Sequence, residues 1–381
     1  MGNRLAIIGA GKFQWRLVET AKDMGYETHV FAWQEGAVCQ EIADFFYPIS
    51  ITDYDVITDV CRQIQVQGVV TLGSDLAVLT VNQVAARLHL PHNPLAALPA
   101  MTNKFLMRQL MVQAGVPVGP FLRLTSSADD GWRSFKRPFI IKPTDRSGSR
   151  GVFLVEAQTS DEIILERIQM AISQSIEKAC LIETYIPGQE FSAEGMSFNG
   201  EHRLIQVTEK FTTGSPHYIE TGHLQPARLS PAACQAVESQ LIALLKAYDY
   251  QFGASHLEFK CTPDGEIWPI EIGLRGGGDY ISSDLIKLST GYDYVQMVIL
   301  AAVGLSPWQV AHSHNPYSAV RFLLSEADLL WYNRFKSLKP NLICFSEVMP
   351  QSFGHPVVDS STRLGHLVVA GDEAVLSLLN A

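Results

Sequence analysis

The sequence predicts an α/β protein whose first part holds a parallel sheet with helices on both faces. In that part, short apolar runs alternate with segments of helical periodicity, as strands and crossover helices do. Further along, Asn199-Gly200 and Asp264-Gly265 each separate two strand-like runs, which indicates antiparallel hairpins in an α+β region. Short strand-like runs after Tyr317 predict a small terminal α+β unit.

The elements of the first domain, residues 1–98, follow from this alternation. Pro91, Pro94 and Pro99 interrupt the pattern and mark the boundary. We expect strands at 5–9, 28–33, 45–49 and 68–72, and helices at 13–24, 56–64 and 76–88.

The second domain, residues 99–305, begins with a helix that Thr102 or Asn103 caps and Gly115 ends. The long polar stretch 209–226 predicts an irregular loop, which is either a lid or binding loop or a disordered segment. We assign residues 306–381 to the terminal unit. The expected strands are 138–142, 152–155, 180–185, 191–198, 203–209, 253–260 and 266–272, and the later helices are 161–175 and 232–248.

Composition and charge restrict the classes of function. Hydrophobic residues make up 47% of the 381 residues and charged residues 18%, which excludes a disordered chain and suits two or three domains. The net charge of −10 lacks the positive field that holds a phosphate backbone. We therefore expect no nucleic-acid partner, although a local basic pocket can still take a small anion.

Cysteine usage and hydropathy predict a cytoplasmic protein. The six cysteines are scattered without a C-x-x-C pair, which indicates a reducing compartment without a zinc site or disulfides. The apolar run that ends at Gly9 is typical of a strand and too short for a signal sequence. The longest apolar run, 295–305, is far shorter than the ~20 residues of a membrane span, so we expect no membrane partner.

The motif Gly9-Ala-Gly11 between a strand and a helix is similar to a dinucleotide fingerprint. Gln14 replaces the third glycine, and the second strand carries no acidic residue at its tip, since Glu35 lies beyond it. We therefore interpret the motif as a tight turn of a scaffold domain and reject NAD binding.

Lys142 ends an apolar strand, and the loop that follows it is rich in small residues and arginine. Such a loop, from Ser147 to Gly151, can wrap backbone N–H groups around phosphates, but it is not a Walker loop. An exposed hairpin loop with two arginines is the alternative. A lysine at the end of an apolar strand favours the anionic ligand, because it needs a partner.

Two carboxylates give the sharpest signal. If Asp264-Gly265 is a two-residue turn, Glu258 lies opposite Glu271, about 5 Å apart at Cβ. At an effective dielectric near 20 the repulsion is on the order of 3 kcal/mol. Mg²⁺ or Mn²⁺ would offset it, as would one protonated acid, or Lys260 or Arg275 alone.

Three further features accompany these carboxylates. Arg275 and the glycines after it can stabilise an anionic intermediate, or form only a flexible surface loop. His256 shares the strand face of Glu258 and is either a substrate-site group or a structural histidine. The run 181–190 breaks from strand into turn; its backbone can pair with adenine and Glu190 with a ribose, although strand and turn alone explain it equally well.

In their order and spacing, these motifs resemble the ATP-grasp superfamily along nearly the whole chain. That resemblance implies a Rossmann-like domain, then an ATP-grasp fold of two α+β lobes, the smaller at about 120–188. Asn103-Lys104-Phe105 is similar to the entry helix of the family. The stretches 218–223 and 275–278 are most similar to the branch of L-amino-acid ligases and other carboxylate–amine ligases. Gly273 departs from the family's Glu-x-Asn-x-Arg, which puts a second metal ion in doubt.

The resemblance implies a role for each matching residue. ATP contacts are implied for Lys104, Lys142, Ser147, Gly148, Ser149, Gly151, Glu183, Tyr185, Ile186, Glu190 and Lys210. Substrate contacts are implied for Glu220, His223, Arg275, Gly276 and Gly277, metal binding for Glu258 and Glu271, and catalysis for Arg275 and Lys142.

The implied activity is an ATP-dependent ligase that uses Mg²⁺ or Mn²⁺. ATP would phosphorylate a carboxylate, and an amine would attack the acyl phosphate to give an amide, ADP and phosphate. The expected partners are a small carboxylate and an amine, which the same resemblance implies to be amino acids, and a second copy in a homodimer. Carboxylation through carboxyphosphate and a non-catalytic nucleotide-binding role are the alternatives.

Overall fold

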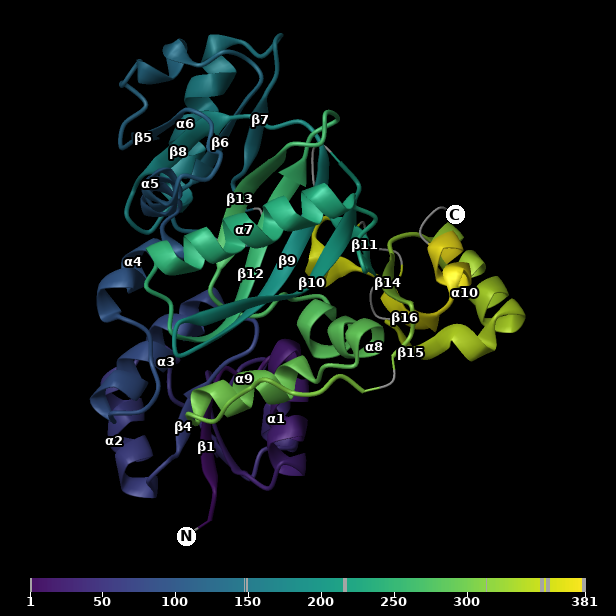
Figure 1. The fold of residues 1–381 in the computed structure, drawn as a ribbon. Helices are drawn as coiled ribbons and strands as arrows, with labels where there is room; N and C mark the ends of the chain where they lie inside the picture. The colour runs from purple at the N-terminus through teal and green to yellow at the C-terminus, as the bar shows by residue number, and fades with distance from the viewer. Residues whose placement is uncertain are drawn as a thin grey trace.

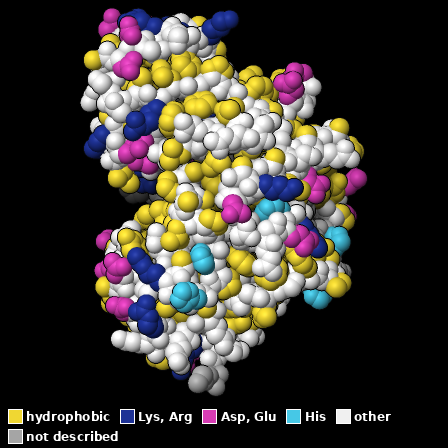
Figure 2. All heavy atoms as spheres, turned by 60° about the vertical axis from the view of Figure 1, so that its left-hand side comes forward, with side chains coloured by type: hydrophobic (Ala, Val, Ile, Leu, Met, Phe, Trp, Pro, Cys, Tyr) yellow, Lys and Arg dark blue, Asp and Glu magenta, His cyan; other side chains and the backbone are white. Residues whose placement is uncertain are grey.

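A computed structural model describes residues 2–146, 148, 150–214, 218–312, 314–349, 353 and 357–378. Three sheets and the helices around them make up this part of the chain (Figure 1). None of its helices is both long and apolar enough to cross a membrane. On the face drawn in Figure 2, acidic and basic side chains are interspersed and neither sign forms a continuous patch.

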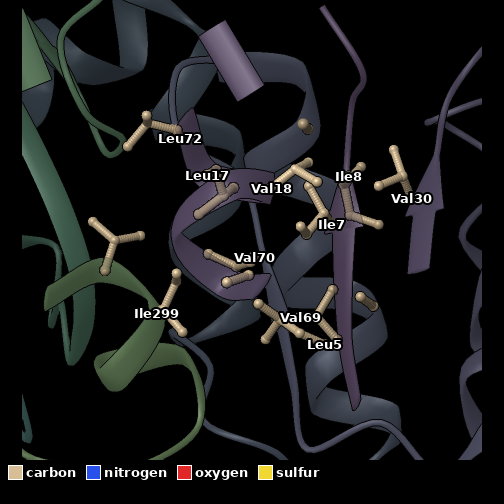
Figure 3. Close-up of a cluster of buried hydrophobic side chains, with 14 of the residues drawn as sticks. Leu5, Ile7, Ile8, Leu17, Val18, Val30, Val69, Val70, Leu72 and Ile299 are labelled. Carbon is tan, nitrogen blue, oxygen red and sulfur yellow. The ribbon is translucent and has the colours of Figure 1, made fainter. Parts of the chain in front are cut away.

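The first sheet is parallel throughout, as the sequence predicts, with strand order β3-β2-β1-β4. Apolar side chains from its strands and from the first helix fill the core, among them Leu5, Ile7 and Leu17 (Figure 3). Its strands are β1 (Arg4–Ile8), β2 (Glu27–Phe31), β3 (Phe45–Tyr47) and β4 (Gly68–Val70), and its helices are α1 (Lys12–Asp23), α2 (Tyr54–Ile64) and α3 (Asp75–Arg87).

A helix from much later in the chain completes this first core. Helix α9 (Tyr294–Ala302) buries Ile299 in the same apolar cluster as Val70 and Leu5 (Figure 3). Gly68 lies so close to this helix that a Cβ there would be 2.8 Å from the Ala302 carbonyl oxygen. The N-terminal sheet is therefore anchored to the region that follows the second hairpin.

The second sheet is small and antiparallel, with strand order β5-β8-β6-β7, at the top of Figure 1. Helix α6 (Asp161–Gln174) covers one face, where Ile164 and Ile168 are fully buried. The short α4 (Leu98–Thr102) and the longer α5 (Lys104–Ala114) lead into it. Its strands are β5 (Phe121–Leu124), β6 (Phe139–Pro143), β7 (Phe153–Val155) and β8 (Cys180–Thr184).

The third sheet joins both hairpins to the C-terminal strands in the order β13-β12-β9-β10-β11-β14-β16-β15. Helix α7 (Pro231–Ala247) lies across it (Figure 1). The first five strands along this order are β13 (Ile267–Gly273), β12 (Phe252–Cys261), β9 (Gln189–Phe198), β10 (Glu201–Thr212) and β11 (Glu220–Gln225). The others are β14 (Tyr317–Leu323), β16 (Gly365–Gly371) and β15 (Ile343–Val348), accompanied by α8 (Ile286–Thr290) and α10 (Glu326–Leu338).

The prediction of an irregular loop over residues 209–226 is largely wrong. Strand β10 continues to Thr212 and β11 begins at Glu220, so most of the stretch is paired strand. Polar residues concealed this in the sequence, because the tertiary structure buries them: His223 and Gln225 are almost fully inaccessible and the Gln225 amide donates to Thr208. Residues 215–217 lie outside the described part.

Both predicted hairpins are confirmed. Asn199 and Gly200 have φ of 51° and 73°, the left-handed pair that a two-residue turn between twisted strands requires. The second hairpin closes between Thr262 and Glu266 around a three-residue turn, with the Thr262 amide donating to the Glu266 carbonyl oxygen.

We expect Asn103→Ala to lower the free energy of unfolding by about 1 kcal/mol, since its Oδ1 accepts from the amides of Phe105 and Leu106 at the start of α5. Chemical denaturation followed by circular dichroism measures the change. Asn103→Asp, which keeps the accepting oxygen, is the matched control and should stay within a few tenths of a kcal/mol of wild type. Equal losses in both variants would contradict the capping role.

Candidate active site

The candidate site lies where the small antiparallel sheet approaches the β12–β13 hairpin of the large sheet. Lys104, at the start of α5, links the two: its Nζ donates to the Arg146 carbonyl oxygen at 2.7 Å and to Glu271 Oε1 at 2.9 Å. Lys104 is 6% exposed, so this bond is shielded from solvent. The first residue of the entry helix therefore contacts both the loop after β6 and the carboxylate strand.

Glu258 and Glu271 face each other across the β12–β13 ladder, as predicted. The pairing results from two deviations that cancel. The three-residue turn, one residue longer than expected, would by itself set Glu258 opposite Ile270. A β-bulge next to Glu258 leaves Ile270 unpaired and restores the Glu258–Glu271 pair.

A separate lysine neutralises each of these carboxylates. Lys210 on β10 donates to Glu258 Oε1 at 2.7 Å, and Lys104 pairs with Glu271. Burial acts to raise the pKa of Glu258, but the charges of Lys210 and His256 hold it well below its usual range. Lys260 and Arg275, the cations considered from the sequence, bond elsewhere: Lys260 lies 3.6 Å from Glu190.

Lys142 belongs to a second buried ion cluster, centred on Glu183 of β8. The Lys142 Nζ and the Arg108 guanidinium both contact the Glu183 carboxylate, and all three residues are at most 9% exposed. Burial lowers the pKa of Lys142, although the Glu183 carboxylate opposes this. Sequence reasoning missed Arg108, for which the signal was its position one helical turn after Lys104.

The glycine-rich loop after β13 is tied to the large sheet by Glu194 of β9, which is fully buried. Its Oε2 accepts from the Gly277 amide at 3.1 Å, and its Oε1 lies 2.5 Å from His256 Nδ1. His256 Nε2 in turn lies 3.4 Å from Glu258. A buried chain thus runs from the carboxylate pair to the loop, and Glu194 was not foreseen.

The amides of the glycine loop were expected to face substrate. Gly277 donates to Glu194, and Gly276 donates to the Leu72 carbonyl oxygen at 2.8 Å. Both N–H groups therefore donate to protein acceptors in this structure, and the substrate contacts of Gly276 and Gly277 stay predictions.

Arg275 is held by the N-terminal domain. Its Nε donates to Asp75 Oδ1 at 2.8 Å, at the start of α3. Gly273 makes this pairing possible, because a Cβ there would lie 3.2 Å from the guanidinium carbon and 3.3 Å from Asp75 Oδ1. The asparagine usual in the family would compete for the space that the Arg275–Asp75 pair occupies.

Glu220 and His223, the other predicted substrate residues, lie on β11 beside the glycine loop. The Glu220 carboxylate accepts from Arg363 at 3.0 Å, and His223 Nε2 lies 3.8 Å from Asp279. His223 is 1% exposed, so it lies behind the surface of the site. Arg363, from the C-terminal part, was not foreseen.

The remaining predicted ATP residues lie after β8, at the start of β9 and in the loop between β6 and β7. Lys260 is stacked over the Tyr185 ring, 5.0 Å from its centroid, and approaches Glu190 at the start of β9. Ile186 follows in the same turn after β8. Gly148 and Gly151 have φ of 71° and 73°, so both need glycine's freedom. Ser147 and Ser149 lie outside the described residues.

The donors present fit a hard divalent cation only in part. Within the described part of the chain, no group of three or more His, Cys, Asp or Glu side chains is arranged to hold a metal ion. Two facing carboxylates are, however, a sufficient protein share for Mg²⁺, which usually keeps water and takes further oxygens from phosphates. Glu258 and Glu271 would hold it.

Comparison with known proteins agrees with this architecture. Residues 135–284 match the ATP-grasp domain. The chain is 26% identical over 267 residues to protein y4rH of Sinorhizobium fredii, covering 68% of this chain and 53% of that protein. It is 24% identical over 343 residues to mouse (Mus musculus) carnosine synthase 1, covering 82% and 41% respectively. The solved L-amino acid ligase of Bacillus licheniformis superposes with a TM-score of 0.81 at 19% identity, covering 99% of this chain and 96% of that one.

The chain therefore contains an ATP-grasp domain at residues 135–284, which confirms the predicted family for this part, and the predicted fold class is confirmed. The parallel N-terminal sheet followed by antiparallel sheets is shared with solved ATP-grasp structures over nearly the whole chain. It spans about half or less of the length of the curated relatives that it matches first.

Lys210→Met should strengthen the binding of Mn²⁺ in the absence of nucleotide, because it removes the cation that now neutralises Glu258. We expect an increase of about tenfold, near 1.4 kcal/mol. Titration with Mn²⁺ followed by electron paramagnetic resonance measures it. Lys287→Met, which removes an exposed lysine bonded to Asp293, is the control. Unchanged Mn²⁺ affinity in Lys210→Met would show that Lys210 does not compete with the cation.

Proposed function

We propose that this protein is an ATP-dependent carboxylate–amine ligase that forms an amide bond through an acyl phosphate. One observation carries the proposal: Glu258 and Glu271 face each other, and each is paired with a lysine whose charge a polyphosphate can take over. ATP-grasp relatives named carnosine synthase and L-amino acid ligase support amino acids as the substrates.

Nucleotide binding would redistribute the charges of the site. In the structure Lys104 and Lys210 bond to the carboxylates, and Lys142 bonds to Glu183. Phosphate oxygens are stronger competitors for these ammonium groups because they carry more charge. The lysines would turn to the phosphates and leave Glu258 and Glu271 free to bind the cation.

The adenosine end of ATP would lie in the turn after β8. The backbone at Tyr185 and Ile186 belongs to neither a helix nor a strand and would offer its peptide groups to the edge of a base. Glu190, at the start of the next strand, is partly exposed and can accept from ribose hydroxyls. Lys260, bonded to Glu190 and stacked on Tyr185, would fix these two side chains.

The chain's own residues would direct the transfer itself. A divalent cation, when bound, neutralises charge on the transferring phosphoryl group. Arg275, held by Asp75 next to the glycine loop, supplies a second positive charge at the same end of β13. Glu194 and Leu72 hold that loop by its amides, so the guanidinium keeps its position while the substrate carboxylate attacks the γ-phosphorus and ADP leaves.

An amine would then attack the acyl phosphate and release phosphate. The attacking nitrogen must lose a proton, and water must be kept away, because hydrolysis would waste the activated carboxylate. The small sheet, which carries Lys142 and Glu183, would close over the phosphates and exclude water when nucleotide binds.

The decisive experiment is product analysis with MgATP, pooled carboxylates and pooled amino acids. We expect ADP and phosphate only when a carboxylate and an amine are both present, and mass spectrometry should detect the amide. Bicarbonate is tested separately. AMP with pyrophosphate, or ADP release that depends on bicarbonate alone, would overturn the proposal.

Glu258→Gln and Glu271→Gln should each lower kcat by at least 100-fold while the melting temperature changes by no more than a few degrees. Each variant removes half of the negative charge that would bind the cation. Coupled ADP-release kinetics measure the loss. Glu266→Gln, at an exposed position at the end of the same turn, is the matched control and should keep wild-type activity. Full turnover in both site variants would exclude the metal role.

A further inference from the structure

The C-terminal part of the chain reaches the substrate side of the site through one buried cation. Arg363, 4% exposed, precedes β16 and donates from Nη1 to Asp279 at 2.9 Å and from Nη2 to Glu220 at 3.0 Å. Its guanidinium carbon also lies 3.6 Å from the centre of the Phe322 ring. The side chain is therefore fixed on three sides.

Arg363 donates to one oxygen of the Glu220 carboxylate and to one oxygen of the Asp279 carboxylate, and it does not contact the second oxygen of either group. Within the part of the chain that the structure describes, Glu220 Oε1 and Asp279 Oδ1 accept no hydrogen bond. The Glu220 and Asp279 side chains are 29% and 22% exposed, so both carboxylates are partly accessible to a ligand. Two partly exposed acceptors held by a common cation suit a ligand that donates hydrogen bonds.

Glu220, Asp279, Arg363 and His223 form one cluster, and its net charge is negative. Glu220 and Asp279 contribute two negative charges and Arg363 one positive charge. Burial lowers the pKa of His223, the fourth member, so it adds no full positive charge near neutral pH. A cationic ligand would restore the balance, whereas a carboxylate would be repelled.

The backbone at this point also needs support. Asp279 and Tyr280 have φ of 50° and 68°, a left-handed conformation that is strained for residues other than glycine. The Arg363–Asp279 bond is a tertiary contact that can hold the loop in this conformation. Loss of Arg363 should therefore release the loop that follows Arg275.

We propose that Glu220 and Asp279 bind the ammonium group of the amine substrate and that Arg363 is the positioning residue that presents them. The inference rests on the proposed function, since it names the amine side of that same site. Either carboxylate is also placed to receive the proton that the ammonium group loses before its nitrogen forms the C–N bond and phosphate leaves. No oxidant or further reactant is required.

The test compares Arg363→Met with a matched variant, Arg321→Met. Arg321 also lies in the C-terminal part, bonds to Asp328 at 3.0 Å and is stacked 4.0 Å from the Trp331 ring centre, but it contacts neither Glu220 nor Asp279. With the substrates found by product analysis, we expect KM for the amine to rise at least tenfold in Arg363→Met only, with KM for ATP unchanged. Equal effects in both variants, or a change confined to ATP, would overturn the assignment.

A second measurement does not depend on turnover. Ligand-observed NMR with amino acid amides, which carry an ammonium group but no carboxylate, should show binding to the wild-type chain and loss of binding in Asp279→Asn. N-acetyl amino acids should not bind at this position. Binding of the N-acetyl compounds in place of the amides would refute the ammonium site, even if the ligase activity is established.

Hydrogen exchange separates positioning from general destabilisation. Amides 276–282 should exchange faster in Arg363→Met and not in Arg321→Met. If Arg363→Met does not fold, Arg363→Lys replaces it, because a single ammonium group keeps the charge but cannot bridge both carboxylates in the planar geometry of guanidinium. If no substrate pair supports turnover but the amides bind as expected, the proposed ligase reaction fails and the ammonium site stands.

Discussion

The repulsion between Glu258 and Glu271 is the constraint on which the rest of the site depends. Two carboxylates on facing positions of one ladder cannot both remain charged in a partly buried place without cations nearby. The fold supplies Lys210 from β10 of the same sheet and Lys104 from α5, the helix that leads into the small sheet. The hairpin therefore holds together three elements that lie far apart in the sequence.

The same principle extends outward from the hairpin. Each buried charge around it has a partner: Lys142 and Arg108 share Glu183, His256 contacts Glu194, and Arg275 bonds Asp75. Such pairs contribute little net stability, because desolvation offsets their attraction, but removing one partner is costly. Their value here is geometric, since they fix the glycine loop and the cations around the carboxylates.

All three parts of the chain contribute to the site. The N-terminal domain supplies Asp75, the central region supplies the carboxylates, and the C-terminal part supplies Arg363. Two features make this possible: α9 completes the N-terminal core, and β14, β16 and β15 extend the large sheet. The terminal residues therefore share a sheet with the hairpin instead of forming a separate layer.

The sequence by itself determined most of the elements and the central pair. Periodicity located the strands and helices, Asn199-Gly200 fixed one turn, and the acidic positions of the second hairpin gave the Glu258–Glu271 pair. That pair was predicted through a turn one residue too short, and a bulge that leaves no local signal compensated for the error. Local pattern is readable because it reflects contacts between residues close in the chain.

Only the tertiary structure decided which cation meets which carboxylate. Arg108 meets Glu183 across 75 positions, Arg363 meets Glu220 across 143, and Arg275 meets Asp75 across 200. Nothing in the periodicity of either partner encodes such a pairing, since the charges stand on elements that come together only when the sheets pack. The fate of 209–226 has the same cause: its polar residues look like loop until neighbouring strands satisfy their hydrogen bonds.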